Sequence, residues 1–78
     1  MRYILFTLPH CPKCPTVVDF LDLQGISFEQ IDASDAKNED IVQKYGIGTV
    51  PTLVVLNQGK IVDMASGFED IQALIEHS

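Results

Sequence analysis

The only two cysteines of the chain form the sequence Cys11-Pro12-Lys13-Cys14, which lies between an apolar run and an amphipathic run. The apolar run, residues 3–8, is typical of a buried strand, whereas the apolar residues after the cysteines recur at helical spacing. The cysteines are therefore expected where a strand ends and a helix begins. Unpaired backbone N–H groups and the positive end of the helix dipole stabilise an anion there, and a thiolate is such an anion.

The start of that first helix remains open between two positions. Cys11 can be the N-cap, with Pro12 in the first turn, where the missing N–H removes no hydrogen bond. However, Pro15 lacks the N–H that would bond to the Cys11 carbonyl, so the regular helix can instead begin near Pro15. Gly25 is expected to end the helix in the left-handed conformation.

Apolar runs and turn residues alternate over the rest of the chain. We expect strands over residues 26–31, 52–56 and 60–64, and a hairpin turn at Asn57-Gln58-Gly59 between the last two. Helices are expected from about residue 36 or 39 to 45 and over residues 68–76. The predicted order is β-α-β-α-β-β-α, an α/β fold in a single domain over residues 1–78.

The spacing of the two cysteines predicts dithiol–disulfide chemistry. With two residues between them at a helix start, the two sulfur atoms come within bonding reach. We expect an exposed Cys11 to attack a substrate disulfide and an inward-facing Cys14 to resolve the mixed disulfide. The positive charge of Lys13 should lower the pKa of Cys11, and His10 is a second candidate for tuning it.

A second informative stretch is Thr49-Val50-Pro51-Thr52. A proline that enters a strand cannot donate to the sheet, which suggests a special need of the backbone. We expect a cis Val50–Pro51 bond packed beside Cys11. The backbone of Val50 would then be free to pair with an extended substrate segment.

Taken together, these motifs resemble the thioredoxin superfamily, and the short segment before Cys11 resembles a glutaredoxin. The resemblance covers essentially the whole chain and implies a four-stranded mixed sheet with helices on both faces. It also implies that Cys11 is the nucleophile, Cys14 the resolving thiol and Pro51 the cis-proline. Ser66-Gly67-Phe68 resembles the small redoxins that reduce ribonucleotide reductase, and Thr49, Val50, Pro51, Gly67 and Phe68 are the expected substrate-binding residues.

Departures from the family pattern bear on the electron donor. Glutaredoxins usually have a lysine for the glutathione carboxylate where this chain has Leu8, and an aromatic residue where it has Lys13. Thioredoxins have a buried aspartate where this chain has Leu5. We therefore expect recharging by an enzyme of the thioredoxin-reductase type, with a glutathione-dependent glutaredoxin as the alternative.

Charge and composition limit the other partners. The net charge of −6 disfavours contact with the phosphate backbone of a nucleic acid. No apolar run approaches the length that spans a membrane. In the cytoplasm, an isolated Cys-x-x-Cys motif is more often catalytic or metal-binding than a structural disulfide. We expect this chain to act there as a monomer. The substrates would be disulfide-bearing proteins, and the redox-active Cys11–Cys14 disulfide would act without a bound cofactor.

A metal carrier is the rival interpretation from another functional class. Small copper chaperones also place Cys-x-x-Cys between a first strand and a first helix, and two thiolates suit Cu(I). Their order, however, is β-α-β-β-α-β, whereas this sequence predicts a helix after its second strand. A structural zinc site needs four ligands, and Cys11, Cys14, His10 and His77 are a poor set.

Overall fold

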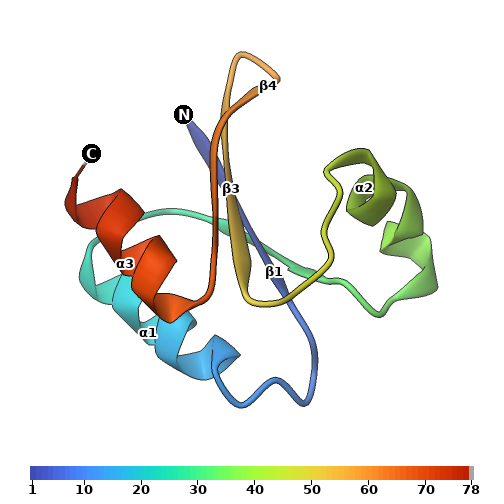
Figure 1. Cartoon of the computed structure of the whole chain (residues 1–78), viewed down its shortest axis with the longest axis horizontal. Helices are drawn as coiled ribbons and strands as arrows, with labels where there is room; N and C mark the ends of the chain where they lie inside the picture. The colour runs from blue at the N-terminus through green and yellow to red at the C-terminus, as the bar shows by residue number, and fades with distance from the viewer. Residues whose placement is uncertain (78) are drawn as a thin grey trace.

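A computed structural model describes residues 1–77 and contains one sheet of four strands. The strands are β1 (Arg2–Thr7), β2 (Glu29–Asp32), β3 (Thr52–Asn57) and β4 (Lys60–Ser66), in the spatial order β2-β1-β3-β4. β1 pairs in parallel with β2 and antiparallel with β3, and β3 pairs antiparallel with β4. The sheet is therefore mixed, and its two central strands are β1 and β3 (Figure 1).

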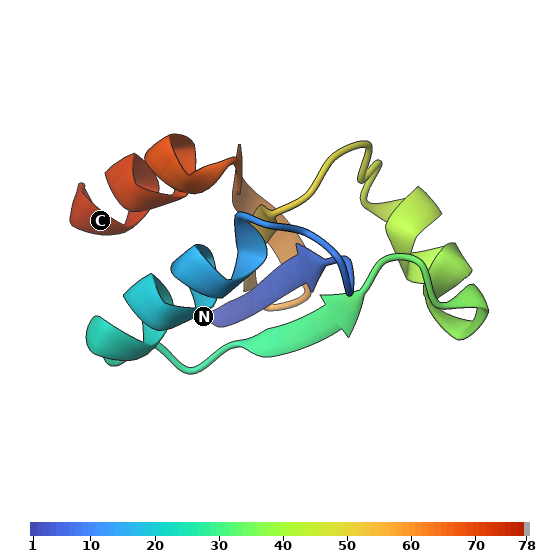
Figure 2. The same cartoon turned by 90° about the horizontal axis from the view of Figure 1, so that it is seen from below.

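Helices cover both faces of this sheet. α1 (Cys14–Leu23) and α3 (Phe68–Glu76) lie side by side on one face, while α2 (Glu39–Lys44) lies on the other (Figure 2). A short 3₁₀ helix, Ala36–Asn38, leads into α2. The observed order of elements and the four-stranded mixed sheet confirm the predicted α/β fold class.

The alternation of side chains along the central strands divides the core in two. Leu5 and Leu53 face α1 and α3, where they pack with Val17, Leu21 and Ile71. Ile4, Phe6, Val54 and Leu56 face the other way, and partly buried side chains of α2 and its flanking loops pack against them. Both central strands are thus buried on both faces, which explains their nearly continuous apolar sequences.

The starts of two elements differ from the sequence-based expectation, and β4 ends at Ser66 rather than at residue 64. The first helix begins at Cys14 with Lys13 as its N-cap, so the start near Pro15 is correct and the start at Cys11 is wrong. The second strand begins at Glu29 rather than at residue 26. Ile26 and Phe28 instead pack against the core beneath α1 and α3. Their apolar character reflects contact with the helices, and pairing with β1 starts only at Glu29.

None of the helices described within residues 1–77 combines the length and the apolar character that crossing a membrane requires.

Candidate active site

The loop that joins β1 to α1 places the two cysteines in different environments. The Cys11 N–H donates to the Leu8 carbonyl oxygen at 3.2 Å, which turns the chain after β1. Cys11 is partly exposed, whereas Cys14, the first residue of α1, is only 4% exposed. Both are free thiols. An accessible thiol therefore stands directly in front of a buried one.

The pKa values of the two thiols shift in opposite directions. Partial burial acts to raise the pKa of Cys11, but a hydrogen bond from the Cys14 thiol, backbone hydrogen bonds from Lys13 and Cys14 and the Lys13 charge lower it below its ordinary value. Burial raises the pKa of Cys14 to about 11, and its hydrogen bond to Cys11 adds to that rise. At neutral pH Cys11 is thus the better source of a thiolate, which is the nucleophilic form.

The Val50–Pro51 loop comes to this end of the sheet because β1 and β3 are neighbours. The Val50–Pro51 peptide bond is cis. The Pro51 carbonyl oxygen accepts a hydrogen bond from the Gly67 N–H at 2.9 Å, which ties the loop to the start of α3. Gly67 has a φ of +84°, a backbone conformation that favours glycine at this turn.

The Thr52 hydroxyl anchors the same loop from inside the protein. It donates to the Thr49 carbonyl oxygen at 2.7 Å and lies 2.9 Å from the Ser66 hydroxyl. Thr52 is only 2% exposed, so water cannot easily replace these partners. This one side chain therefore links the Val50–Pro51 loop to the end of β4.

We expect Thr52→Val to destabilise the protein by about 1–3 kcal/mol, because it removes the hydrogen bonds of the hydroxyl to the Thr49 carbonyl oxygen and the Ser66 hydroxyl, each worth about 0.5–1.5 kcal/mol. Urea unfolding followed by circular dichroism measures this change. Thr16→Val is the matched control, since Thr16 is exposed on α1 and should change the stability by less than about 0.5 kcal/mol. Equal stability of the two variants would contradict the anchoring role.

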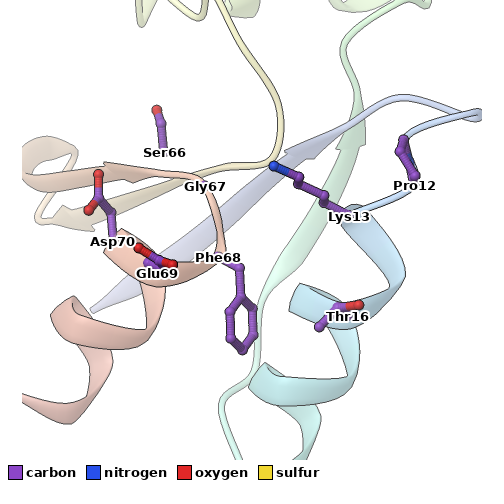
Figure 3. Close-up of a pocket in the computed structure, with 8 residues that line it drawn as sticks. All are labelled: Pro12, Lys13, Thr16, Ser66, Gly67, Phe68, Glu69 and Asp70. Carbon is purple, nitrogen blue, oxygen red and sulfur yellow. The ribbon is translucent and has the colours of Figure 1, made fainter.

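Three cavities surround the cysteines. One of about 570 Å³ lies between the α1 and α3 starts, and Figure 3 shows its lining by Pro12, Lys13, Thr16, Ser66, Gly67, Phe68, Glu69 and Asp70. A second, of about 580 Å³, is lined by Leu8, Pro9, His10, Cys11, Pro12, Ser34 and Val50. A third, of about 530 Å³, is lined by Thr7, Leu8, Pro9, Cys11, Cys14, Pro15, Val18, Asp19, Gln30 and Asp32. Cys11 therefore borders two of the three cavities, and Lys13 borders the remaining one.

The structure brings most of the predicted site residues to these cavities, but Pro51 is fully buried and lines none of them. Val50 and His10 share one cavity with Cys11. Lys13, Gly67 and Phe68 share another, and the Phe68 ring packs edge to face on Phe20 at 5.6 Å between centroids. Thr49 is exposed and lines none of the three cavities. The catalytic and binding roles of these residues, including tuning by His10, stay predictions.

Four acidic residues near the site were missed by sequence reasoning. Asp19 and Asp32 line the cavity that contains both cysteines, and Glu69 and Asp70 line the cavity of Lys13. Asp32 also accepts hydrogen bonds from the backbone N–H and hydroxyl of Ser34, which lower its pKa. Asp19 follows Cys14 on α1, so helical spacing could have placed it there, whereas only the tertiary fold brings the other three residues to these cavities.

Over residues 1–77, no group of three or more histidine, cysteine, aspartate or glutamate side chains is arranged to hold a metal ion. The Cys11–Cys14 pair therefore stands as a two-thiol site.

Comparisons with known proteins point to one group. The family model described as "Glutaredoxin" matches residues 3–61. Glutaredoxin 3 of Escherichia coli (strain K12) is 31% identical over 72 residues, which cover 90% of this chain and 81% of that protein. Thioredoxin of Bacillus subtilis (strain 168) is 29% identical over 75 residues, which cover 91% of this chain and 72% of that protein.

The structural comparison agrees with the sequence comparison. The crystal structure of Fasciola hepatica thioredoxin superposes with a TM-score of 0.79 and 25% sequence identity. The match covers 96% of this chain and 74% of the Fasciola chain.

Proposed function

Because this chain belongs to the glutaredoxin family of the thioredoxin superfamily, we propose that it is a dithiol–disulfide oxidoreductase that reduces disulfides in other proteins. One observation supports this function above all others. A partly exposed thiol of lowered pKa, Cys11, is hydrogen-bonded to a buried thiol of raised pKa, Cys14, at the start of a helix. The partly exposed Cys11 suits attack on a substrate disulfide, and the buried Cys14 suits the later, intramolecular attack on the Cys11 sulfur.

The proposed reaction has two exchange steps. The Cys11 thiolate attacks one sulfur of the substrate disulfide, and the other substrate sulfur leaves as a thiolate that takes a proton from water. Cys14 then loses its proton and attacks the Cys11 sulfur, which releases the second substrate thiolate. The substrate gains two electrons, and the protein is left with a Cys11–Cys14 disulfide.

A two-electron donor must then restore the dithiol. We propose a flavin-dependent enzyme of the thioredoxin-reductase type, with glutathione as the alternative. Support comes from Leu8, an apolar side chain on the cavity beside Cys11 where glutaredoxins usually have the lysine that holds a glutathione carboxylate. Among the described residues, Lys13 is the one lysine or arginine that lines any of the three cavities. In this proposal the chain acts as a cytoplasmic monomer.

The donor preference is tested by comparing two recycling systems with insulin as the disulfide substrate. We expect NADPH with thioredoxin reductase to support faster insulin reduction than glutathione with glutathione reductase and NADPH. Escherichia coli glutaredoxin 3 serves as the comparison protein in both systems. Faster turnover with the glutathione system would overturn the donor assignment and leave the dithiol mechanism in place.

A further inference from the structure

Two of the three cavities differ in chemical character: Cys11 lines one of them, and its near neighbour Lys13 lines the other. They meet at Pro12, which lines both of them. On one side the walls are mostly apolar and include Leu8 and Val50. On the other side the walls carry the charged side chains of Lys13, Glu69 and Asp70 (Figure 3). A polypeptide that crosses Pro12 with its cysteine at Cys11 would therefore meet two unlike surfaces.

The apolar side is continuous with the reactive sulfur. Leu8 follows the end of β1 and remains 39% exposed, and it lines the same cavity of about 580 Å³ as Cys11. A single exposed leucine is ordinary. Here its position matters, because Leu8, Val50 and Cys11 border one space. An apolar side chain next to the substrate cysteine would lose water contact in that space, and this favours binding.

Three charged side chains line the cavity on the other side of Pro12. Within the described part of the chain, Lys13, Glu69 and Asp70 form no ion pair with one another or with other residues. Figure 3 shows Lys13 reaching from the α1 side toward the turn at Gly67, while both carboxylates project from the first turn of α3. Their charges therefore remain available to a partner.

The balance of charge on this side favours a basic partner. Two carboxylates face one ammonium, and the charge of Lys13 already acts on the Cys11 thiolate. The net charge of the whole chain, −6, acts in the same direction over longer distances. A lysine or arginine of the substrate would thus be attracted to Glu69 and Asp70, whereas an acidic residue would be repelled.

We propose that the protein selects polypeptide disulfides in which the cysteine has an apolar side chain on one flank and a basic side chain on the other. The apolar side chain occupies the cavity of Leu8 and Val50, and the basic one lies against Glu69 and Asp70. This inference rests on the proposed function, since it names the substrate class of the same site. Leu8, Glu69 and Asp70 are then specificity-determining residues and not catalytic ones.

The test uses short peptides with one cysteine, activated as a mixed disulfide with thionitrobenzoate. Attack by Cys11 on the peptide sulfur joins the peptide to the protein and releases the coloured thionitrobenzoate anion, so the second-order rate constant is read directly. Peptides carry leucine and lysine on the two flanks, leucine and glutamate, or serine and lysine, each in both sequence orders. We expect the rate constant of the leucine–lysine peptide, in its faster sequence order, to exceed that of the leucine–glutamate peptide by about threefold to tenfold. The same rate constant should exceed that of the serine–lysine peptide by about tenfold.

Matched variants separate the local surfaces from the overall charge. Glu69→Gln with Asp70→Asn should remove most of the preference for lysine over glutamate. Glu39→Gln with Asp40→Asn, the same Glu-Asp pair in the first turn of α2, is the control and changes the net charge equally. For the apolar side, Leu8→Asn should remove most of the preference for leucine over serine, and Leu23→Asn is the control on an 85% exposed leucine.

Each outcome decides the inference. Equal rates for all peptides, or equal effects of the site and control variants, would overturn it while leaving the proposed function in place, since Cys11 would still form mixed disulfides. Failure of Cys11 to react with any of the peptides would instead contradict the proposed function itself. Loss of the selectivity only in the site variants would establish the two specificity surfaces.

Discussion

Cys11→Ser should lower protein-disulfide reduction to the uncatalysed background, a loss of several orders of magnitude, because a serine hydroxyl stays protonated and attacks disulfides poorly. Cys14→Ser should keep the first exchange step but lose the second. A covalent adduct between Cys11 and the substrate would then accumulate, since no neighbouring thiol resolves it. Insulin reduction and mass spectrometry of the trapped adduct measure the two effects.

Folding of these variants needs its own control, because Cys14 is nearly buried and a serine hydroxyl there lacks an assured partner. Cys14→Ala avoids this problem and should also trap the adduct. Circular dichroism spectra that match the parent protein would show that both variants are folded. Full turnover by a folded Cys11→Ser protein, or rapid release of substrate from a folded Cys14→Ala protein, would reverse or abolish the assigned roles.

Phe6→Ala should lower the free energy of unfolding by about 3–5 kcal/mol. Phe6 is fully buried on β1, and its ring packs edge to face on Tyr45 with 6.2 Å between the centroids. Its removal would leave a cavity between the sheet and the α2 side of the core. A domain of this length has a total stability of only about 4–12 kcal/mol, so the variant should be partly unfolded or close to it.

Urea unfolding followed by circular dichroism measures the change in the Phe6 variant. Leu23→Ala is the matched control, because Leu23 is 85% exposed and its truncation should change the stability by less than about 0.5 kcal/mol. Phe6→Leu should fall between the two. A Phe6→Ala protein within about 1 kcal/mol of the parent would mean that α2 and its loops contribute little to the core.

Much of this fold follows from local sequence. The apolar residues 3–8 and 52–56 predict central strands, and β1 and β3 fill that role. The positions of Pro12 and Pro15 leave two helix starts open, and only packing decides between them. In the structure Cys14 turns into the core, and the Val17 N–H donates to the Lys13 carbonyl oxygen at 3.4 Å. The N-cap is therefore Lys13, two residues later than Cys11.

The parts that sequence could not predict depend on contacts between distant segments. Ile26 and Phe28 alternate like strand residues, yet they pack beneath helices, because apolar alternation does not distinguish a helix contact from a sheet contact. Glu69 and Asp70 have the ordinary sequence of an acidic first helical turn. Their position across a cavity from Lys13 arises only because α3 begins beside α1.

The central claim is that Cys11 is the reactive thiol and Cys14 the protected one. Alkylation of the reduced protein by iodoacetamide, with each cysteine followed by mass spectrometry from pH 5 to 11, tests it most directly. We expect Cys11 to be alkylated first and its rate to level off below the ordinary pKa of a cysteine, because its thiolate forms at lower pH. Cys14, measured in the Cys11→Ser protein, should react slowly until the pH exceeds the ordinary pKa of a cysteine, because burial is the main cause of its raised pKa and remains in that variant. Alkylation of Cys14 before Cys11, or of both with the same pH dependence, would contradict the account.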